Sequence, residues 1–396
     1  MSSSFITELE NRGLIFDHTL PLDELHDMFD ETKNSVSFYI GFDPTADSLH
    51  VGSLQQLIIM DIAKKHGHNP IVLLGGATAS IGDPSFKDSM RPIMTTNKIS
   101  ENTGFISTQV NNIIPSVQVV NNLGWTQNMN LLDFLRDFGK HFSVNKMLSS
   151  SAVKDRLSRE DSGLSFLEFS YSLLQGFDFL KLNERQNVTV QMGGSDQFFN
   201  ILQGVDLVHK VTGKKVVGIT NPLVLKYDDT KMGKTVNGAV WLDKDKTSVF
   251  DFFQFWRNID DIETVELSKR FLGLEVKATD DINQVKKHLA LSMVEFVHGI
   301  SEKELLIEDL SKGTASKKIL VNRSDVNNIF DVVMLSGLFS SKGEVRRMIK
   351  NKENLVVNDV KIEDENLLNI EPNNSSEFFI QKGKKQKVSI ILEGGV

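Results

Sequence analysis

The sequence has 396 residues, of which 40% are hydrophobic and 24% charged, a composition typical of a soluble globular protein of roughly two or three domains. It contains no apolar run of about 18 residues and no basic start followed by an apolar leader, so we expect neither a membrane-spanning helix nor a signal peptide. The absence of cysteine excludes disulfides, thiolate metal sites and a cysteine nucleophile, and it fits a reducing cytoplasm.

The net charge of −8 argues mildly against a nucleic-acid partner. The charge is uneven, however, because the chain from about Lys312 onward is slightly basic. A local basic patch can bind RNA on an acidic protein, so composition permits an RNA partner without indicating one.

The first half of the chain alternates between strand-like and helix-like segments. Apolar runs of strand length occur at Val36–Ile40, Ile71–Leu74, Val117–Val120 and Val188–Met192. Between the first two, Leu54–Lys65 has apolar residues at helical spacing. This alternation predicts an α/β fold with a parallel sheet, whose ligands bind at the carboxyl ends of the strands. The loops after Tyr39, Leu74 and Met192 are therefore expected to carry the chemistry.

Farther along, the pattern changes. The segment from about Phe250 to Glu308 is predicted to be helical, Ser311–Lys318 is small, polar and basic like a linker, and a helix is expected over Lys342–Lys350. We therefore expect a doubly wound, Rossmann-like domain (1–225), a loop and α-helical domain (226–312), a linker (313–328) and a small α+β unit (329–396).

Two short segments suit nucleotide chemistry. A turn-rich loop follows the first strand and leads into a helix near Gly52, where free N–H groups favour phosphate. His50 beside this helix end is placed to bond a phosphate oxygen, although a capping or surface histidine would fit the same pattern. Lys231 and Lys234 flank Gly233, and two lysines on such a loop suit pyrophosphate or are simply solvated charges.

These segments resemble the signatures of class I aminoacyl-tRNA synthetases. His50-Val51-Gly52-Ser53 is similar to the HIGH motif, and Lys231-Met232-Gly233-Lys234-Thr235 is similar to the KMSKS motif, in the family's order. Three further segments resemble the bacterial and organellar tyrosyl-tRNA synthetases: Gly75–Pro84, Tyr171–Asp178 and Gln191–Gln197. Five motifs in order over nearly the whole chain are hard to explain by chance.

The resemblance implies tyrosine as a substrate. It assigns the phenol hydroxyl to Tyr39 and Asp178, the ammonium group to Tyr171, Gln175 and Asp83, and the carboxylate region to Gln197, with Gln191 in the same pocket. Spacing adds support, because Tyr171, Gln175 and Asp178 share one face of the helix predicted over 166–182. Only 3 tyrosines occur beside 26 phenylalanines, and two of them fall on this site. The alternative is a core aromatic at 171 and a surface acid at 178.

The resemblance also implies ATP as a substrate, with Mg²⁺ entering alongside it and no metal held tightly by protein ligands. The expected ATP contacts are Gly41, Asp43, Thr45, His50, Gly52, Gly194, Asp196, Lys231, Met232 and Lys234. Catalysis is expected from His50, Ser53, Lys231, Lys234 and Thr235, without a protein nucleophile. Two departures from the family pattern are Ser53, where the second HIGH histidine would stand, and Phe199, where glycine is usual.

The C-terminal unit resembles a small RNA-binding module of a ribosomal protein and of pseudouridine synthases. Its predicted helix carries Lys342, Arg346 and Lys350 on one face with Arg347 beside them, which suits RNA phosphates or an ordinary solvated helix. The family implies tRNA(Tyr) as partner, a homodimer, no membrane and a cytoplasmic location.

Two alternative functions remain. A tryptophan-specific ligase would share the architecture but should lack the pair Tyr39 and Asp178. A non-catalytic RNA-binding protein on the same scaffold is kept open by Ser53 and Phe199, and the two lysines of the second motif argue against it.

Overall fold

The computed structural model describes residues 4–30, 32, 35–83, 94–149, 153–154, 157, 165–226, 230, 232–235, 238–301, 318–351, 353–358, 360–370, 377–383 and 386–393. The chain forms two compact units, Met1–Gly299 and Ile300–Val396. No helix within these described ranges is both long and apolar enough to cross a membrane.

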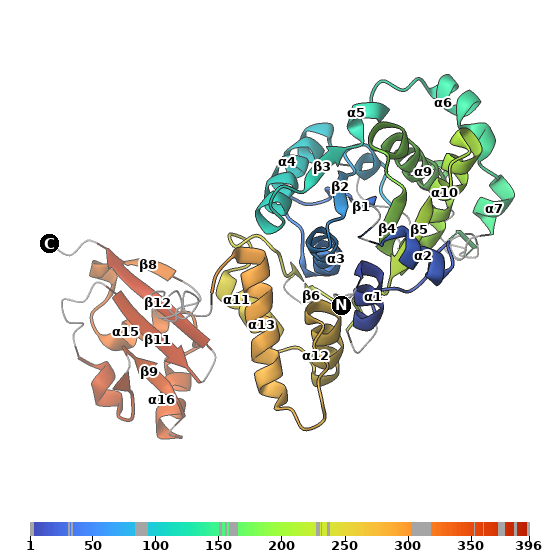
Figure 1. Ribbon diagram of the computed structural model, residues 1–396. Coiled ribbons are helices and arrows are strands. Elements are labelled where there is room, and N and C mark those ends of the chain that lie inside the picture. Colours follow the sequence, from blue (N-terminus) through green and yellow to red (C-terminus); the bar gives the residue numbers. More distant parts are fainter. Residues whose placement is uncertain are drawn as a thin grey trace. The chain divides into compact units, whose positions relative to one another are not determined.

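A five-stranded parallel sheet lies at the centre of the first unit (Figure 1). Its strands are β1 (Ser37–Phe42), β2 (Asn69–Leu74), β3 (Gln118–Asn121), β4 (Val190–Gly194) and β5 (Val217–Asn221), in the order β3-β2-β1-β4-β5. Tyr39 of β1 pairs with Ile71 of β2 and Gln191 of β4. The strand order reverses between β1 and β4, which places a ligand crevice at the carboxyl ends of these strands. The predicted doubly wound sheet is confirmed.

The helices around this sheet begin and end where local signals place them. They are α1 (Phe5–Arg12), α2 (Leu22–Met28), α3 (Leu54–Lys65), α4 (Thr96–Ile113), α5 (Leu123–Thr126), α6 (Leu131–Asp137), α7 (Val144–Leu148), α9 (Phe166–Gln186) and α10 (Phe198–Thr212). Helix α9 starts at a capping box of Ser165 and Glu168 and ends at Asn187, whose φ is 52°. Helices α9 and α10 pack side by side next to β4 and β5 (Figure 1).

Short helical turns join several of these elements. They are η1 (Val51–Ser53), η2 (Thr78–Ser80), η3 (Gly139–His141) and η4 (Ser195–Gln197). Of these, η1 follows the loop after β1 and leads directly into α3, so the predicted helix start near Gly52 is confirmed. A two-stranded ribbon, β6 (Lys234–Thr235) and β7 (Gly238–Ala239), follows later in the chain.

The predicted helical segment belongs to the first compact unit as far as Gly299, and its last residues, 302–308, lie outside the described residues. It comprises α11 (Val249–Arg257), α12 (Asp261–Leu267), the π-helical turn η5 (Ser268–Leu272) and α13 (Ile282–His298). Side chains of Ser248, Asp260 and Asp281 accept backbone N–H bonds at the starts of the three α-helices. Phe252 of α11 is fully buried and its ring meets His298 of α13 edge-on with the ring centroids 5.0 Å apart, so aromatic packing joins α11 and α13.

The second unit is a mixed sheet with helices. Its strands β8 (Lys318–Asn322), β9 (Leu355–Val357), β10 (Val360–Lys361), β11 (Glu377–Lys382) and β12 (Gln386–Glu393) have the order β10-β9-β11-β12-β8. Helices α15 (Ile329–Leu335) and α16 (Lys342–Lys350) and the turns η6 (Arg323–Asp325) and η7 (Glu365–Leu368) complete it. Strand β8 pairs in parallel with β12, so residues 318–322 of the segment predicted as a linker lie in this sheet.

Candidate active site at the carboxyl edge of the parallel sheet

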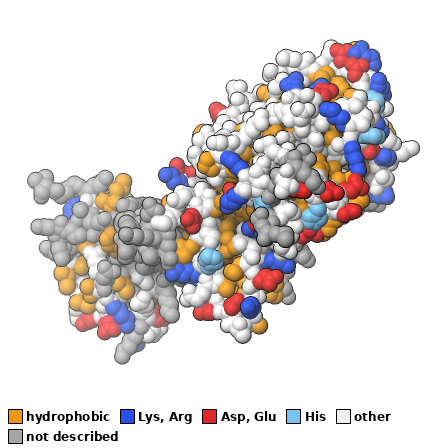
Figure 2. Space-filling view, viewed as in Figure 1, with side chains coloured by type: hydrophobic (Ala, Val, Ile, Leu, Met, Phe, Trp, Pro, Cys, Tyr) orange, Lys and Arg blue, Asp and Glu red, His pale blue; other side chains and the backbone are white. Residues whose placement is uncertain are grey.

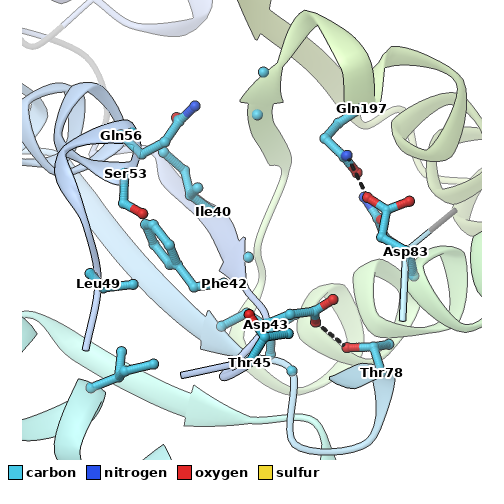
Figure 3. A pocket seen from close by; sticks show the side chains of 18 of the residues that line it. Ile40, Phe42, Asp43, Thr45, Leu49, Ser53, Gln56, Thr78, Asp83 and Gln197 are labelled. Carbon is cyan, nitrogen blue, oxygen red and sulfur yellow. Dashed lines mark hydrogen bonds between the residues drawn. The ribbon is translucent and has the colours of Figure 1, made fainter. Parts of the chain in front are cut away.

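A cavity of about 530 Å³ opens at the carboxyl ends of β1 and β4. The loop after β1, the start of η1, α9 and the turn after β4 supply most of its wall. The sequence-predicted residues that line it are Tyr39, Gly41, Asp43, Thr45, His50, Gly52, Ser53, Asp83, Tyr171, Gln175, Asp178, Gln191, Gly194, Asp196 and Gln197. Figure 3 shows part of this wall from close by. Phe199 lies in the first turn of α10 and is not among the lining residues.

Asp178 of α9 is a buried carboxylate with two fixed hydrogen bonds. Its side chain lines the cavity and is only 3% exposed. Asn122 Nδ2 donates to Oδ2 at 2.9 Å, and Trp125 Nε1 donates to Oδ1 at 2.8 Å. Burial raises the pKa of Asp178 from 3.8 to about 7, the two hydrogen bonds oppose that rise, and the charge of Asp43 adds to it. The carboxylate is thus held in place and is a proton acceptor near neutral pH.

Tyr39 of β1 presents a buried hydroxyl to the same cavity. The residue is 1% exposed, and its ring packs edge-on against Phe179 with the ring centroids 5.4 Å apart. No hydrogen-bond partner for its hydroxyl occurs among the described residues. Burial, followed by the negative charge of Asp178, raises the pKa of Tyr39 well above its ordinary value, so the hydroxyl keeps its proton. A buried donor without a partner is costly, which favours a ligand that accepts from it.

Asp43, directly after β1, connects three parts of the site. Tyr171 Oη donates to Asp43 Oδ2 at 3.0 Å, and Thr78 Oγ1 donates to Oδ1 at 2.7 Å (Figure 3). Burial and the charge of Asp43 raise the pKa of Tyr171 well above its usual value. A Cβ atom at Gly75 would lie 2.1 Å from Asp43 Oδ1, so the close approach of this carboxylate requires glycine there.

Asp83 and two glutamines lie on the β4 side of the cavity. Gln197 Nε2 donates to Asp83 Oδ2 at 2.8 Å (Figure 3), and Asn200 Nδ2 donates to Gln197 Oε1 at 3.1 Å. Gln191 of β4 is buried, and its Oε1 atom has no hydrogen-bond partner among the described residues. The cavity wall therefore carries a held carboxylate and amide groups close to the phenol-binding candidates.

His50 forms the N-cap of η1. Its Nδ1 atom accepts a hydrogen bond from Gly52 N at 3.0 Å, and its ring meets Trp241 edge-on with the ring centroids 6.3 Å apart. A Cβ atom at Gly52 would lie 2.6 Å from His50 Cε1 and 2.9 Å from Nδ1. Gly52 is thus required by the imidazole that folds over it, and His50 combines the capping role with a position on the cavity wall.

The second motif packs against the first. Met232 is buried, and its N–H donates to the Val224 carbonyl at 3.1 Å. Gly233 has φ of 91°, and a Cβ atom there would lie 2.5 Å from Val51 Cγ2. Lys234 and Thr235 belong to β6, whereas Lys231 lies outside the described residues. The backbone between the two predicted lysines therefore contacts η1, which brings the two motifs together.

A tight turn follows β4. A Cβ atom at Gly194 would lie 2.6 Å from Asp196 Oδ1 and 2.9 Å from Leu223 Cδ2, so the bare backbone is needed there. Both Gly194 and Asp196 line the cavity. A turn of bare backbone allows a ligand to approach closely, and the binding of a nucleotide here stays a prediction.

Comparisons with known proteins agree with this geometry. The family of tRNA synthetases class I (W and Y) matches residues 31–317. The chain is 41% identical to a tyrosine–tRNA ligase of Pelagibacter ubique over 98% of this chain and 100% of the relative. It is also 41% identical to a tyrosine–tRNA ligase of Clostridium botulinum, over 91% of this chain and 93% of that one. The chain belongs to the tyrosine–tRNA ligase family of class I synthetases.

Solved structures of synthetases share this fold. A C-terminally truncated mitochondrial tyrosyl-tRNA synthetase of Aspergillus nidulans superposes with a TM-score of 0.68 at 31% identity, covering 78% of this chain and 93% of that one. A tyrosyl-tRNA synthetase of Archaeoglobus fulgidus reaches 0.54 at 15% identity, covering 78% and 99%, which shows a common fold. The family and the Rossmann-like architecture expected of the synthetase are confirmed.

Sequence reasoning misses the two donors that hold Asp178 of the synthetase. Asn122 and Trp125 lie just after β3. Sequence reasoning also gives no role to Thr78, which lies in η2 after β2. Their position in the sequence could have identified Asn122 and Trp125, because they follow β3. Residues that follow any strand of a parallel sheet lie at the same edge as those that follow β1, β2 and β4.

Proposed function

We propose that this synthetase binds L-tyrosine with its phenol hydroxyl between Tyr39 and Asp178. A phenol hydroxyl donates one hydrogen bond and accepts others, and the site offers a carboxylate acceptor and a protonated hydroxyl donor. Phenylalanine would leave the Tyr39 hydroxyl unpaired and would donate no hydrogen bond to Asp178. Tryptophan brings an indole N–H that donates but does not accept, so it would leave Tyr39 unpaired. The buried Asp178, oriented by Asn122 and Trp125, is the observation that carries the proposal.

The remaining polar groups suit the α-amino and carboxylate ends of tyrosine. Tyr171, Gln175 and Asp83 are proposed to hold the ammonium group, because a carboxylate, a hydroxyl and an amide can all accept from it. Gln197 is proposed to lie near the substrate carboxylate, to which its amide N–H groups can donate, and Gln191 is proposed to line the same tyrosine pocket. All five residues line the same cavity, which supports one bound amino acid.

ATP is proposed to occupy the part of the cavity bounded by the loop after β1, η1 and the turn after β4. Its predicted contacts are Gly41, Asp43, Thr45, His50, Gly52, Gly194, Asp196, Lys231, Met232 and Lys234. The N–H groups of Val51, Gly52 and Ser53 in η1 already have partners within the protein, so the support for phosphate here is the positive end of the α3 helix dipole. Mg²⁺ is proposed to enter bound to ATP, because it keeps much of its hydration and is held mainly through phosphate oxygens.

The proposed reaction has two steps. An oxygen of the tyrosine carboxylate attacks the α-phosphorus of ATP, the bond to the bridging oxygen of pyrophosphate breaks, and tyrosyl-adenylate forms. A ribose hydroxyl at the tRNA 3′ end then attacks the adenylate carbonyl and releases AMP. The attacking carboxylate is already ionised, so positioning and charge stabilisation supply the rate of the first step. His50, Ser53, Lys231, Lys234 and Thr235 are the groups proposed to act there.

The C-terminal unit is proposed to bind tRNA(Tyr) through α16. Val345, Met348 and Ile349 face the core of that unit, which leaves Lys342, Arg346, Arg347 and Lys350 on the exposed side. Phosphate neutralisation by such a face is sequence-independent and depends on salt. Figure 2 shows basic and acidic side chains interspersed over the visible face of the first unit. A one-sided basic helix is therefore the better RNA-binding candidate.

A homodimer is proposed on the family's precedent. Leu131 and Leu132 of α6, Val144 of α7 and Phe166 of α9 are large exposed apolar side chains, and Phe166 is 79% exposed. We propose that they belong to one interface, because clustered exposed apolar groups are typical of protein–protein contact surfaces. Sedimentation of the wild type and of Leu132→Asp measures the dimer, and an unchanged mass in the variant would remove this surface from the proposal.

A cytoplasmic location is proposed because the chain contains no cysteine.

Amino-acid-dependent ATP–pyrophosphate exchange tests the proposed function. Tyrosine, phenylalanine and tryptophan are supplied in parallel, without tRNA. Exchange with tyrosine alone is expected. Exchange with tryptophan would contradict the assignment of the pocket. Folded protein without any exchange would favour the RNA-binding alternative that Ser53 leaves open.

A further inference from the structure

One face of α4 holds the loop that precedes η1. Asn102 Nδ2 donates to the Pro44 carbonyl at 3.0 Å. Gln109 Oε1 accepts from Leu49 N at 2.8 Å, and Gln109 Nε2 donates to Ser48 Oγ at 3.0 Å. Neither amide belongs to the motifs that carry the family resemblance.

The spacing of these residues matches the helix. Asn102, Ile106 and Gln109 recur every three or four positions, so they lie on one face of α4. Asn102 is fully buried and Ile106 is 1% exposed. Ile106 also lines the active-site cavity, which places the two amides on either side of a cavity-wall residue. The face is therefore directed at the loop and the cavity rather than at solvent.

The held loop, residues 44–50, has neither helix nor strand structure over 44–49. Thr45, Ser48 and His50 of the loop line the cavity, as does Asp43 before it. A segment without a ladder of its own depends on outside groups for its backbone hydrogen bonds.

The opposite side of the loop is held by the segment that follows β7. Leu242 N donates to the Leu49 carbonyl at 2.9 Å, and Lys246 Nζ lies 2.7 Å from Asp47 Oδ1. The N–H and C=O groups of Leu49 are thus bound from two different elements, α4 and this segment. Leu49 directly precedes His50, so a shift at Leu49 moves the imidazole.

We propose that Asn102 and Gln109 are positioning residues for ATP: they fix the loop that carries the proposed nucleotide contacts, without touching the nucleotide. The inference rests on the proposed function of this cavity. Tyrosine recognition at Tyr39 and Asp178 uses β1 and α9 and does not depend on these amides. Loss of the α4 contacts is therefore expected to affect ATP selectively.

Gln109→Met tests this inference because methionine has a similar size and lacks the acceptor for Leu49 N. Gln109→Asn keeps the amide but shortens it by one methylene, so it is expected to behave in the same way. Asn111→Ala is the matched control. Asn111 is an exposed amide on the same helix, and in the described structure it donates to the Ser107 carbonyl of its own helix. Pyrophosphate exchange gives kcat/KM for ATP, and equilibrium dialysis gives the Kd for tyrosine.

In both Gln109 variants kcat/KM for ATP is expected to fall about tenfold, because the backbone N–H of Leu49 loses its acceptor. The Kd for tyrosine should not change, and the Asn111→Ala control should match the wild type in both measurements. A folded Gln109→Met protein with wild-type ATP kinetics would overturn the inference, and so would a parallel loss of tyrosine affinity. If Gln109→Met does not fold, Ser48→Ala takes its place. This variant removes the loop hydroxyl to which Gln109 Nε2 donates, and the same results support or overturn the inference. Absence of exchange in the wild type would instead count against the proposed function.

Discussion

Removal of the Tyr39 hydroxyl isolates the recognition of tyrosine. In Tyr39→Phe the aromatic ring and its packing against Phe179 are kept, and no described protein partner of the hydroxyl is lost. The hydrogen bond to the substrate disappears, which costs about 0.5–1.5 kcal/mol for tyrosine. Phenylalanine gains, because wild-type Tyr39 would be left buried and unpaired beside it at a cost of about 1–3 kcal/mol. Together these terms predict a tenfold or larger loss of discrimination, since about 1.4 kcal/mol corresponds to a factor of ten.

The assay is pyrophosphate exchange with tyrosine and with phenylalanine, and the ratio of the two kcat/KM values is the discrimination. The thermal unfolding midpoint of unliganded Tyr39→Phe should equal or exceed that of the wild type, because the variant loses no described protein hydrogen bond and no longer buries an unpaired hydroxyl, so the midpoint is an internal control for folding. An unchanged discrimination ratio in a folded variant would refute the assignment of the Tyr39 hydroxyl to the substrate phenol.

Three further predictions concern other parts of the molecule. The pKa of Asp178 in the folded protein is about 7, above its value in the unfolded chain. The Asp178 carboxyl group therefore keeps its proton below about pH 7 and ionises to the carboxylate above that pH. Tyrosine affinity should therefore rise about tenfold from pH 6 to pH 8 by equilibrium dialysis, while a flat profile would contradict an ionised acceptor. In Gly52→Ala the new methyl group overlaps His50, so the exchange rate should fall at least tenfold with tyrosine affinity intact, whereas Gly104→Ala, which meets no atom within 4 Å, should change neither. Lys350→Glu on α16 should weaken tRNA binding and reduce its salt dependence without affecting exchange, and equal effects on both activities would exclude a dedicated RNA-binding role.

Elements with strong local signals could be predicted from the sequence. Leu54–Lys65 and Lys342–Lys350 form helices with the predicted bounds, since each has periodic apolar residues and clear end signals. Strands β1, β2 and β4 also appear within two residues of the apolar runs that indicate them, although β1 and β4 continue through Gly41 and Gly193. Strand β5 at Val217–Asn221 was missed because its run follows α10 closely and includes the polar Thr220.

The parts that could not be predicted depend on contacts between distant residues. Asn122 reaches Asp178 across 56 positions, and Asp43 reaches Tyr171 across 128, which no periodicity encodes. Strand β8 follows a polar, basic stretch and becomes a strand through its pairing with β12, about 70 residues later. Family motifs identify the catalytic side chains but not the neighbours that orient them.

The attachment of amino acids to tRNA tests the central claim most directly. Labelled tyrosine, phenylalanine and tryptophan are offered separately with ATP and total tRNA to the wild type and to Asp178→Ala. We predict that the wild type attaches only tyrosine and that the folded Asp178→Ala protein loses most of this activity together with its preference for tyrosine over phenylalanine. Attachment of phenylalanine or tryptophan by the wild type, or unchanged tyrosine kinetics in Asp178→Ala, would contradict the account.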